Sequence, residues 1–136
     1  MSALSDLAER KVLDAICGKA TFTHTANMYL ALGTADFGES GTASSELSGN
    51  GYARTQITFG NNAATDSSTN ATTISNTADI DFPAATGSQG TVSHWKLMTA
   101  ATGGDCLAIG SFSTAKTIET NDVLRISSGD LVLTAS

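Results

Sequence analysis

Two pairs of carboxylates come closest to a chemical site in this sequence. Glu39 and Glu46 could in principle act together as a general acid and a general base. They lie in residues 36–51, however, a stretch rich in glycine and serine that is typical of a long exposed loop. Because a flexible loop cannot hold two carboxylates in a fixed geometry, we do not expect a catalytic pair here.

The second pair, Asp79 and Asp81, falls on one face of a predicted strand over residues 77–82. A calcium ion would need several further oxygen ligands, and no glycine-punctuated acidic loop supplies them. We therefore interpret both aspartates as solvated charges on the outer face of a sheet.

The cysteines and histidines do not form a recognisable site either. Cys17 and Cys106 are too few and too far apart for a disulfide framework or a zinc site, so we expect two small buried side chains. His24, expected at the surface, and His94, next to Trp95, lack the G-x-S-x-G and H-E-x-x-H motifs of hydrolases. We predict no catalytic residue, no cofactor and no bound metal.

Composition excludes further classes. The chain has 136 residues, 13 Asp and Glu against 7 Lys and Arg, and a net charge of −6. The cations do not cluster, so no nucleic-acid partner is expected. No apolar run reaches the roughly 18 residues that a membrane span needs. Asp6, Glu9 and Asp14 interrupt the N-terminus, so no signal peptide is predicted.

A helix is predicted over residues 3–17. Ser2 or Ser5 can cap its start and Gly18 can end it. An isolated helix of this length is marginal in water, so its apolar stripe must dock, either as a lid over the strands or against a neighbouring subunit. We accordingly divide the chain into residues 1–19, a helix and linker for docking, and residues 20–136, a β-domain. The stripe consists of Leu4, Leu7, Ala8, Val12, Ala15 and Ile16.

The strands are predicted from alternation. Residues 91–98 and 106–112 form a central hairpin around Gly103 and Gly104, and the small residues of the second strand leave room for a buried Trp95. The polar residues 60–73 form a loop or an exposed edge. The pattern predicts an all-β fold, an antiparallel β-sandwich or a jelly roll with one N-terminal α-helix. The other predicted strands are 28–32, 52–59, 77–82, 116–120 and a hairpin of 123–126 with 131–134.

Several segments, in a fixed order along nearly the whole chain, resemble a family of small virion structural proteins from tailed phages and prophages. The family includes tail-fibre-like and capsid-associated proteins. The resemblance implies a non-enzymatic β-sandwich of the virion, multimeric and assembled in the host bacterial cytoplasm. The segments are Met28–Leu32 with Thr34–Asp36, Gly51–Arg54, Ile57–Gly60, Ser75–Asp79, Phe82–Thr86, Gly90–His94 and Ala100–Gly104.

Within this family we expect a capsid decoration (cement) protein. A tail fibre usually needs an elongated shaft, and the sequence has no internal repeat. The alternative is a small tail, tail-fibre or baseplate module. Such a module could bind carbohydrate, although the chain has few aromatic residues for a sugar site. Expected partners are further copies of the chain, as a homotrimer, and the major capsid protein or other virion proteins. The predicted interface residues are Leu4, Leu7, Val12, Ile16 and Trp95.

Overall fold

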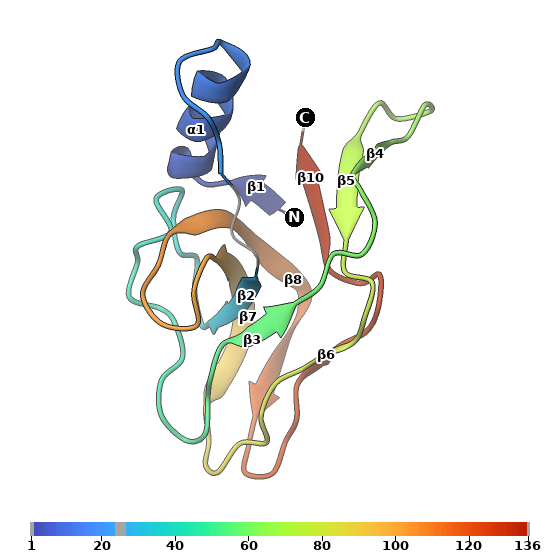
Figure 1. Cartoon of the computed structure of the whole chain (residues 1–136). Coiled ribbons are helices and arrows are strands. Elements are labelled where there is room, and N and C mark those ends of the chain that lie inside the picture. The colour runs from blue at the N-terminus through green and yellow to red at the C-terminus, as the bar shows by residue number, and fades with distance from the viewer. Residues whose placement is uncertain (1, 24–26, 136) are drawn as a thin grey trace.

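The computed structural model describes residues 2–23 and 27–135, and these fold mainly into antiparallel strands with one helix. Figure 1 shows a five-stranded sheet in the order β1-β8-β7-β2-β3 facing two smaller sheets, β10-β5-β4 and β6-β9. The predicted all-β class with an N-terminal helix is confirmed. The elements are β1 Ser2–Leu4, α1 Asp6–Ile16, β2 Met28–Gly33, β3 Thr55–Ile57, β4 Ala64–Thr65, β5 Thr72–Ser75, β6 Ile80–Asp81, β7 Gly90–Met98, β8 Cys106–Ile118, β9 Arg125–Ile126 and β10 Val132–Ala135.

The main core lies between the five-stranded sheet and the two smaller ones. Leu30 of β2, Trp95 of β7 and Ile126 of β9 belong to one buried cluster. Trp95 is 3% exposed and stands opposite Gly110 of β8. Since glycine has no side chain, the indole finds the space that the sequence predicted, and the expected burial of Trp95 is confirmed.

The β7–β8 hairpin is also confirmed, with Gly103 and Gly104 at positive φ in its loop. Strand β8 is longer than predicted, because residues 116–118 continue it and do not form a separate strand. The register jumps, however: Val92 pairs with Lys116, while His94 pairs with Ser111. Strict alternation along residues 91–98 predicts Val92 and Trp95 on opposite faces, but this bulge breaks the alternation, so both pack in the same core cluster.

The alternation of residues 28–32 predicts a strand buried on one face only, but β2 is buried on both faces. Leu30 faces the main core, and Ala31 packs with Met98 and Cys106 in a second cluster. The stretch between β2 and β3 covers this second face, and its Phe37 is 1% exposed. Most of residues 36–51 are exposed and form a loop, as predicted, but Phe37, Gly41 and Leu47 are buried, so the loop is anchored to the sheet and is not flexible throughout.

The start of the helix was predicted too early. Residues Ser2–Leu4 form β1, which pairs with Ala108–Gly110 of β8, and the helix begins only after the cap at Ser5. The edge of β8 offers hydrogen-bond partners to the backbone N–H and C=O groups of these residues, and those bonds would be lost if the residues formed a helical turn. Gly18, at φ 71°, follows the helix as predicted. No helix among the described residues is long and apolar enough to cross a membrane.

The predicted hairpin of residues 123–126 and 131–134 was wrong. Strand β9 pairs with β6 and β10 pairs with β5, so the two segments belong to different sheets. The buried side chain of Asn76 explains the separation: its Nδ2 donates to the carbonyl of Ser127, and its Oδ1 accepts from the amide of Leu131. The turn between β9 and β10 is therefore bound to Asn76, and the strands diverge from it.

Smaller differences concern element lengths and one cysteine. The strands predicted over residues 52–59 and 77–82 are shorter in the structure, where they are β3 and β6. Of the two predictions for residues 60–73, a loop or an exposed edge, the edge is observed, because β4 pairs with β5. Cys106 is buried as expected, but Cys17 is exposed because it lies just beyond the outer end of α1. His24 lies outside the described residues.

Candidate interaction surface

Helix α1 is attached to the sheet by one buried serine. The Ser5 hydroxyl accepts a hydrogen bond from the amide of Ala8 at 3.2 Å and donates to the carbonyl of Cys106 at 2.6 Å. The Ser5 amide donates to the carbonyl of Leu107, and the Asp6 amide to that of Glu39. The first turn is thus bound to β8 and to the stretch between β2 and β3, whereas the outer end of α1 projects beyond the sheets (Figure 1).

Beyond this attachment, α1 exposes apolar side chains. Ala8 is the buried residue of the helix, whereas Val12, Leu13 and Ile16 are 37%, 58% and 72% exposed. Of the two predicted alternatives, docking of the whole stripe as a lid over the strands is therefore not observed among the described residues, and contact with a neighbouring subunit stays a prediction. Large exposed apolar side chains close together are typical of an interaction surface.

The structure brings only part of the predicted interface together. Val12 and Ile16 lie on the exposed part of α1, while Leu4 on β1 and Leu7 on α1 are half-buried. Trp95 lies in the core of the same chain, away from α1. Leu13 was not among the predicted interface residues, although residues three apart in a helix, such as Leu13 and Ile16, have neighbouring side chains.

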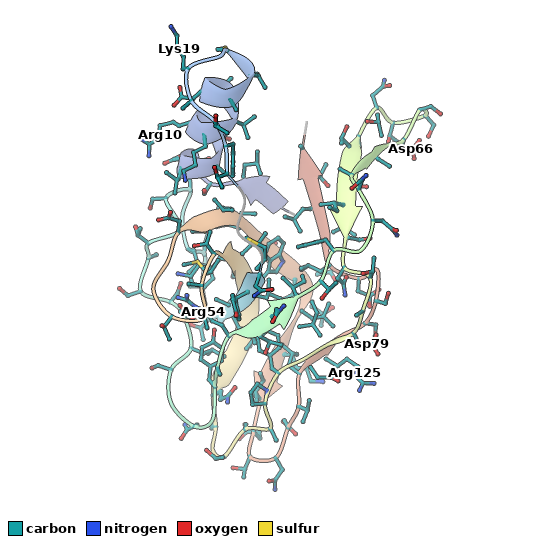
Figure 2. The ribbon with its side chains drawn as sticks, viewed as in Figure 1. Arg10, Lys19, Arg54, Asp66, Asp79 and Arg125 are labelled. Atoms are coloured by element: carbon teal, nitrogen blue, oxygen red, sulfur yellow. The ribbon has the colours of Figure 1, made fainter. Side chains whose placement is uncertain are left out.

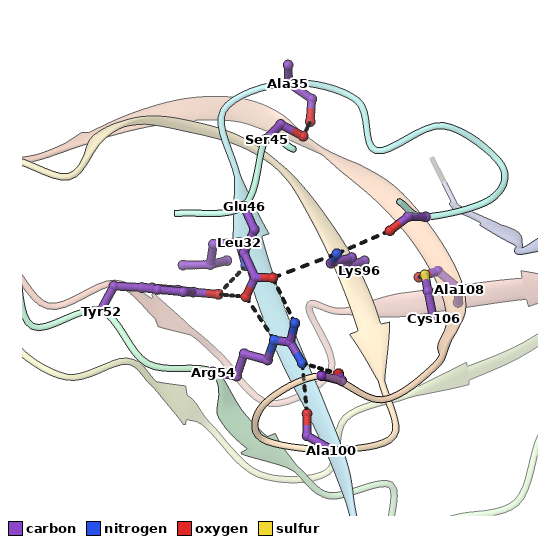
Figure 3. Close-up of polar contacts among 12 residues, drawn as sticks. Leu32, Ala35, Ser45, Glu46, Tyr52, Arg54, Lys96, Ala100, Cys106 and Ala108 are labelled. Carbon is purple, nitrogen blue, oxygen red and sulfur yellow. Dashed lines mark hydrogen bonds and ion pairs between the residues drawn. The ribbon is translucent and has the colours of Figure 1, made fainter. Parts of the chain in front are cut away.

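A partly buried ionic cluster holds the loops beneath α1 (Figure 3). Both carboxylate oxygens of Glu46 accept from the Arg54 guanidinium at 2.8 Å, and one also accepts from the Tyr52 hydroxyl at 2.9 Å. Lys96, 6% exposed, places its Nζ 3.7 Å from Glu46 and donates to the carbonyl of Gly41 at 3.1 Å. One carboxylate is therefore shared by two cations.

Arg54 extends the cluster to the β7–β8 loop. Its guanidinium donates to the carbonyls of Ala100 and Gly103, at 3.0 and 2.7 Å. Arg54 thereby ties this loop to Glu46, whose backbone bridges to Gly33 at the end of β2. The cluster joins three segments that are distant in sequence.

The protonation of the cluster argues against acid–base chemistry. Burial raises the pKa of Glu46, but hydrogen bonds from Arg54 and Tyr52 and the nearby cationic charges outweigh it, so the net pKa is lowered. Burial raises the pKa of Tyr52 and of the Cys106 thiol. An ionised carboxylate bound by cations is a structural group and not a poised proton donor. Glu39, the other member of the considered pair, is exposed.

The aspartates considered for calcium have a cationic partner. Arg125 donates to both oxygens of Asp81, at 2.6 and 3.0 Å, and lies 4.0 Å from Asp79. Figure 2 shows Asp79 and Arg125 on the outside of the molecule; Asp79 directly precedes β6, and Arg125 begins β9. No group of three or more His, Cys, Asp or Glu residues that could hold a metal ion occurs among the described residues.

Comparison with known protein families identifies a family for this chain. The family model described as Podophage GP4 fiber I protein gp80 matches residues 3–134, nearly the whole chain. No curated protein matches the sequence.

Proposed function

The chain belongs to this podophage fiber family and is thus a component of the phage virion, and we propose that it serves as a structural module of a fibre. The observation that carries the proposal is the family match over residues 3–134, because it covers the β-domain and the helix together. A virion fibre protein associates with other virion proteins, and the exposed helix α1 is the surface we propose for such a contact.

The family favours the tail-fibre alternative over the capsid decoration that we expected from the sequence. That expectation depended on the absence of a repeated shaft, but a module of a fibre needs no shaft of its own. The homotrimer and the major capsid protein as a partner stay predictions.

We further propose that the role is non-enzymatic. The carboxylates that could have formed a catalytic pair do not act together, since Glu46 is held by Arg54 and Glu39 is exposed. A carbohydrate site on Trp95 is also disfavoured, because a ring that is 3% exposed cannot stack on a sugar.

Imaging of intact particles tests the proposal. Antibodies against the chain, or single-particle reconstruction, should locate it on fibres in a small number of copies per particle. Labelling spread over the capsid, at about one copy per capsid subunit or per three, would support decoration and refute the fibre assignment. Particles that lack the chain altogether would refute both.

A further inference from the structure

A groove runs between the five-stranded sheet and the sheet that contains β10 (Figure 1). Its volume is about 570 Å³, within the range of ligand sites in proteins. Residues 111–114 of β8 form one wall, and residues 130–132, which lead into β10, form the other. Trp95 and Ile126 are buried and form the floor. The groove is therefore apolar at its base and bounded by two stretches of strand backbone.

The backbone along both walls is not fully used by the sheets. Strand β1 pairs with β8 only at residues 108–110, and the pairing of β7 with β8 jumps from Ser111 to Lys116. Residues 112–115 therefore have no strand partner within the described part of the chain, and residues 113–115 are exposed. In the described chain, β10 is the outermost strand of its sheet, with β5 beside it. Such strand edges bind further strands, because their N–H and C=O groups need partners.

The second wall is held in place by a buried side chain. Asn76 is 1% exposed, and its Oδ1 accepts from the amide of Leu131 at 2.9 Å. Its Nδ2 donates to the carbonyl of Ser127 at 3.0 Å, on the other side of the same turn. A site that is already fixed loses less conformational freedom when a ligand binds. The position of this wall therefore favours binding.

We propose that this groove binds an extended segment of another virion protein by strand addition. The segment lies along residues 112–115 of β8 and continues the existing pairing of β1 with β8, which ends where the groove begins. Side chains alternate along a strand, so every second residue of the segment points to the floor at Trp95 and Ile126. These positions take apolar residues. The wall of β8 spans ~13 Å, so the contact involves about four or five residues of the partner.

Charge specifies a further feature of the partner. Arg125 and Asp130 are the charged side chains that line the groove. Arg125 lies 2.6 Å from Asp81 and 4.0 Å from Asp79, whereas Asp130 has no ion-pair partner among the residues that the structure describes. The segment therefore carries a lysine or arginine that meets Asp130. The inference rests on the proposed function, because it takes the partner from the virion.

Photo-cross-linking in intact particles tests the occupant. A photoreactive amino acid at the exposed position 113 should join the chain to another virion protein, and mass spectrometry should show a joined segment with alternating apolar residues and a lysine or arginine. Position 123 is the matched control, because Val123 is also exposed, at 47%, but does not line the groove. We expect no capture of this segment from position 123.

Two outcomes would overturn the proposal: capture of a second copy of the chain at position 113, or no protein captured there in particles that contain the chain. Capture of a segment without the alternation would also contradict strand addition. The cross-link can fail in particles whose imaging places the chain on fibres, so the groove and the fibre assignment can fail separately.

A synthetic peptide with the captured sequence tests the mode of binding. Its titration into the purified chain, followed by the fluorescence of Trp95, should show saturable binding. Methylation of the backbone nitrogens at alternate residues, on the set that faces β8, keeps every side chain but removes the strand hydrogen bonds. We expect this change to raise the dissociation constant at least about tenfold. Equal affinity of the methylated and unmethylated peptides would refute strand addition.

A charge exchange tests the contact with Asp130. Asp130→Lys should raise the dissociation constant of the peptide about threefold or more, and a peptide with glutamate in place of its basic residue should bind this variant better than the original peptide does. Asp14→Lys is the matched control, because it makes the same change at an exposed site on α1, outside the groove. Equal affinities of the two variants for the original peptide would refute the contact.

Discussion

The ionic cluster around Glu46 makes a quantitative prediction about stability. Glu46→Gln keeps the size of the side chain and one acceptor for Tyr52, but it removes the negative charge that Arg54 and Lys96 share. The Arg54 and Lys96 side chains are only 10% and 8% exposed, so both cations would remain in a poorly solvated place without a counter-ion. The whole loop arrangement beneath α1 is therefore expected to weaken.

The size of the effect follows from burial. Removing one partner of a fully buried ion pair costs about 3–5 kcal/mol. The Glu46 side chain is 22% exposed and glutamine retains one acceptor, so we expect about 2–3 kcal/mol at neutral pH. Urea unfolding followed by the fluorescence of Trp95, the single tryptophan of the chain, measures this loss directly.

Glu39→Gln is the matched control. It makes the same chemical change in the same stretch of chain, but Glu39 is exposed, and we expect a change within about 0.5 kcal/mol. If Glu46→Gln were as stable as Glu39→Gln, the cluster would not stabilise the fold and the reasoning would be refuted.

The same variant predicts a pH dependence. Since the pKa of Glu46 is lowered in the folded chain from its ordinary value of 4.5, its contribution is fully present above that value. The contribution is lost as the pH falls through the folded pKa. The difference in unfolding free energy between the wild type and Glu46→Gln should therefore be constant near neutral pH and shrink at acidic pH. If this difference in unfolding free energy stayed the same at a pH where the carboxylate of Glu46 is protonated, the negative charge of Glu46 would not be the source of the stability.

Three further substitutions, the last with a matched control, test the packing. Trp95→Ala should cost about 3–5 kcal/mol in urea unfolding followed by circular dichroism, because it empties the centre of the core; a loss below 1 kcal/mol would contradict its core position. Ser5→Ala should cost about 2 kcal/mol, since it removes the helix cap and leaves the Cys106 carbonyl without its hydroxyl donor, and unchanged helicity and stability would argue against this attachment. Gly41→Ala should cost at least about 1–3 kcal/mol, because φ is 69° and a Cβ would meet Cys106. Gly38→Ala has a similar φ of 72° and open space, so equal losses for the two glycines would show that contact with Cys106 does not matter.

The sequence alone determined the elements whose signal is local. Alternation between small and large residues predicted the β7–β8 hairpin, and the small residues opposite Trp95 predicted that its ring is buried. Gly18 marked the end of the helix correctly, because a positive φ is a property of a few neighbouring residues, and Ser5 was one of the two predicted caps, although the helix was predicted to start at residue 3. Of the apolar residues exposed on α1, the sequence had singled out Val12 and Ile16.

Tertiary structure decided which distant residues meet. Glu46, Arg54 and Lys96 carry no sequence signal of a shared site, and they come together only because the stretch after β2 folds back over the face of the sheet. The same contact buries the second face of β2, and the bulge in β8 moves Val92 to the core side. Leu4 pairs in a strand, not a helix, because β8 has an edge beside it. The periodicity of apolar residues indicates which side chains favour burial. Which other segment covers them depends on long-range contacts that only the folded chain makes.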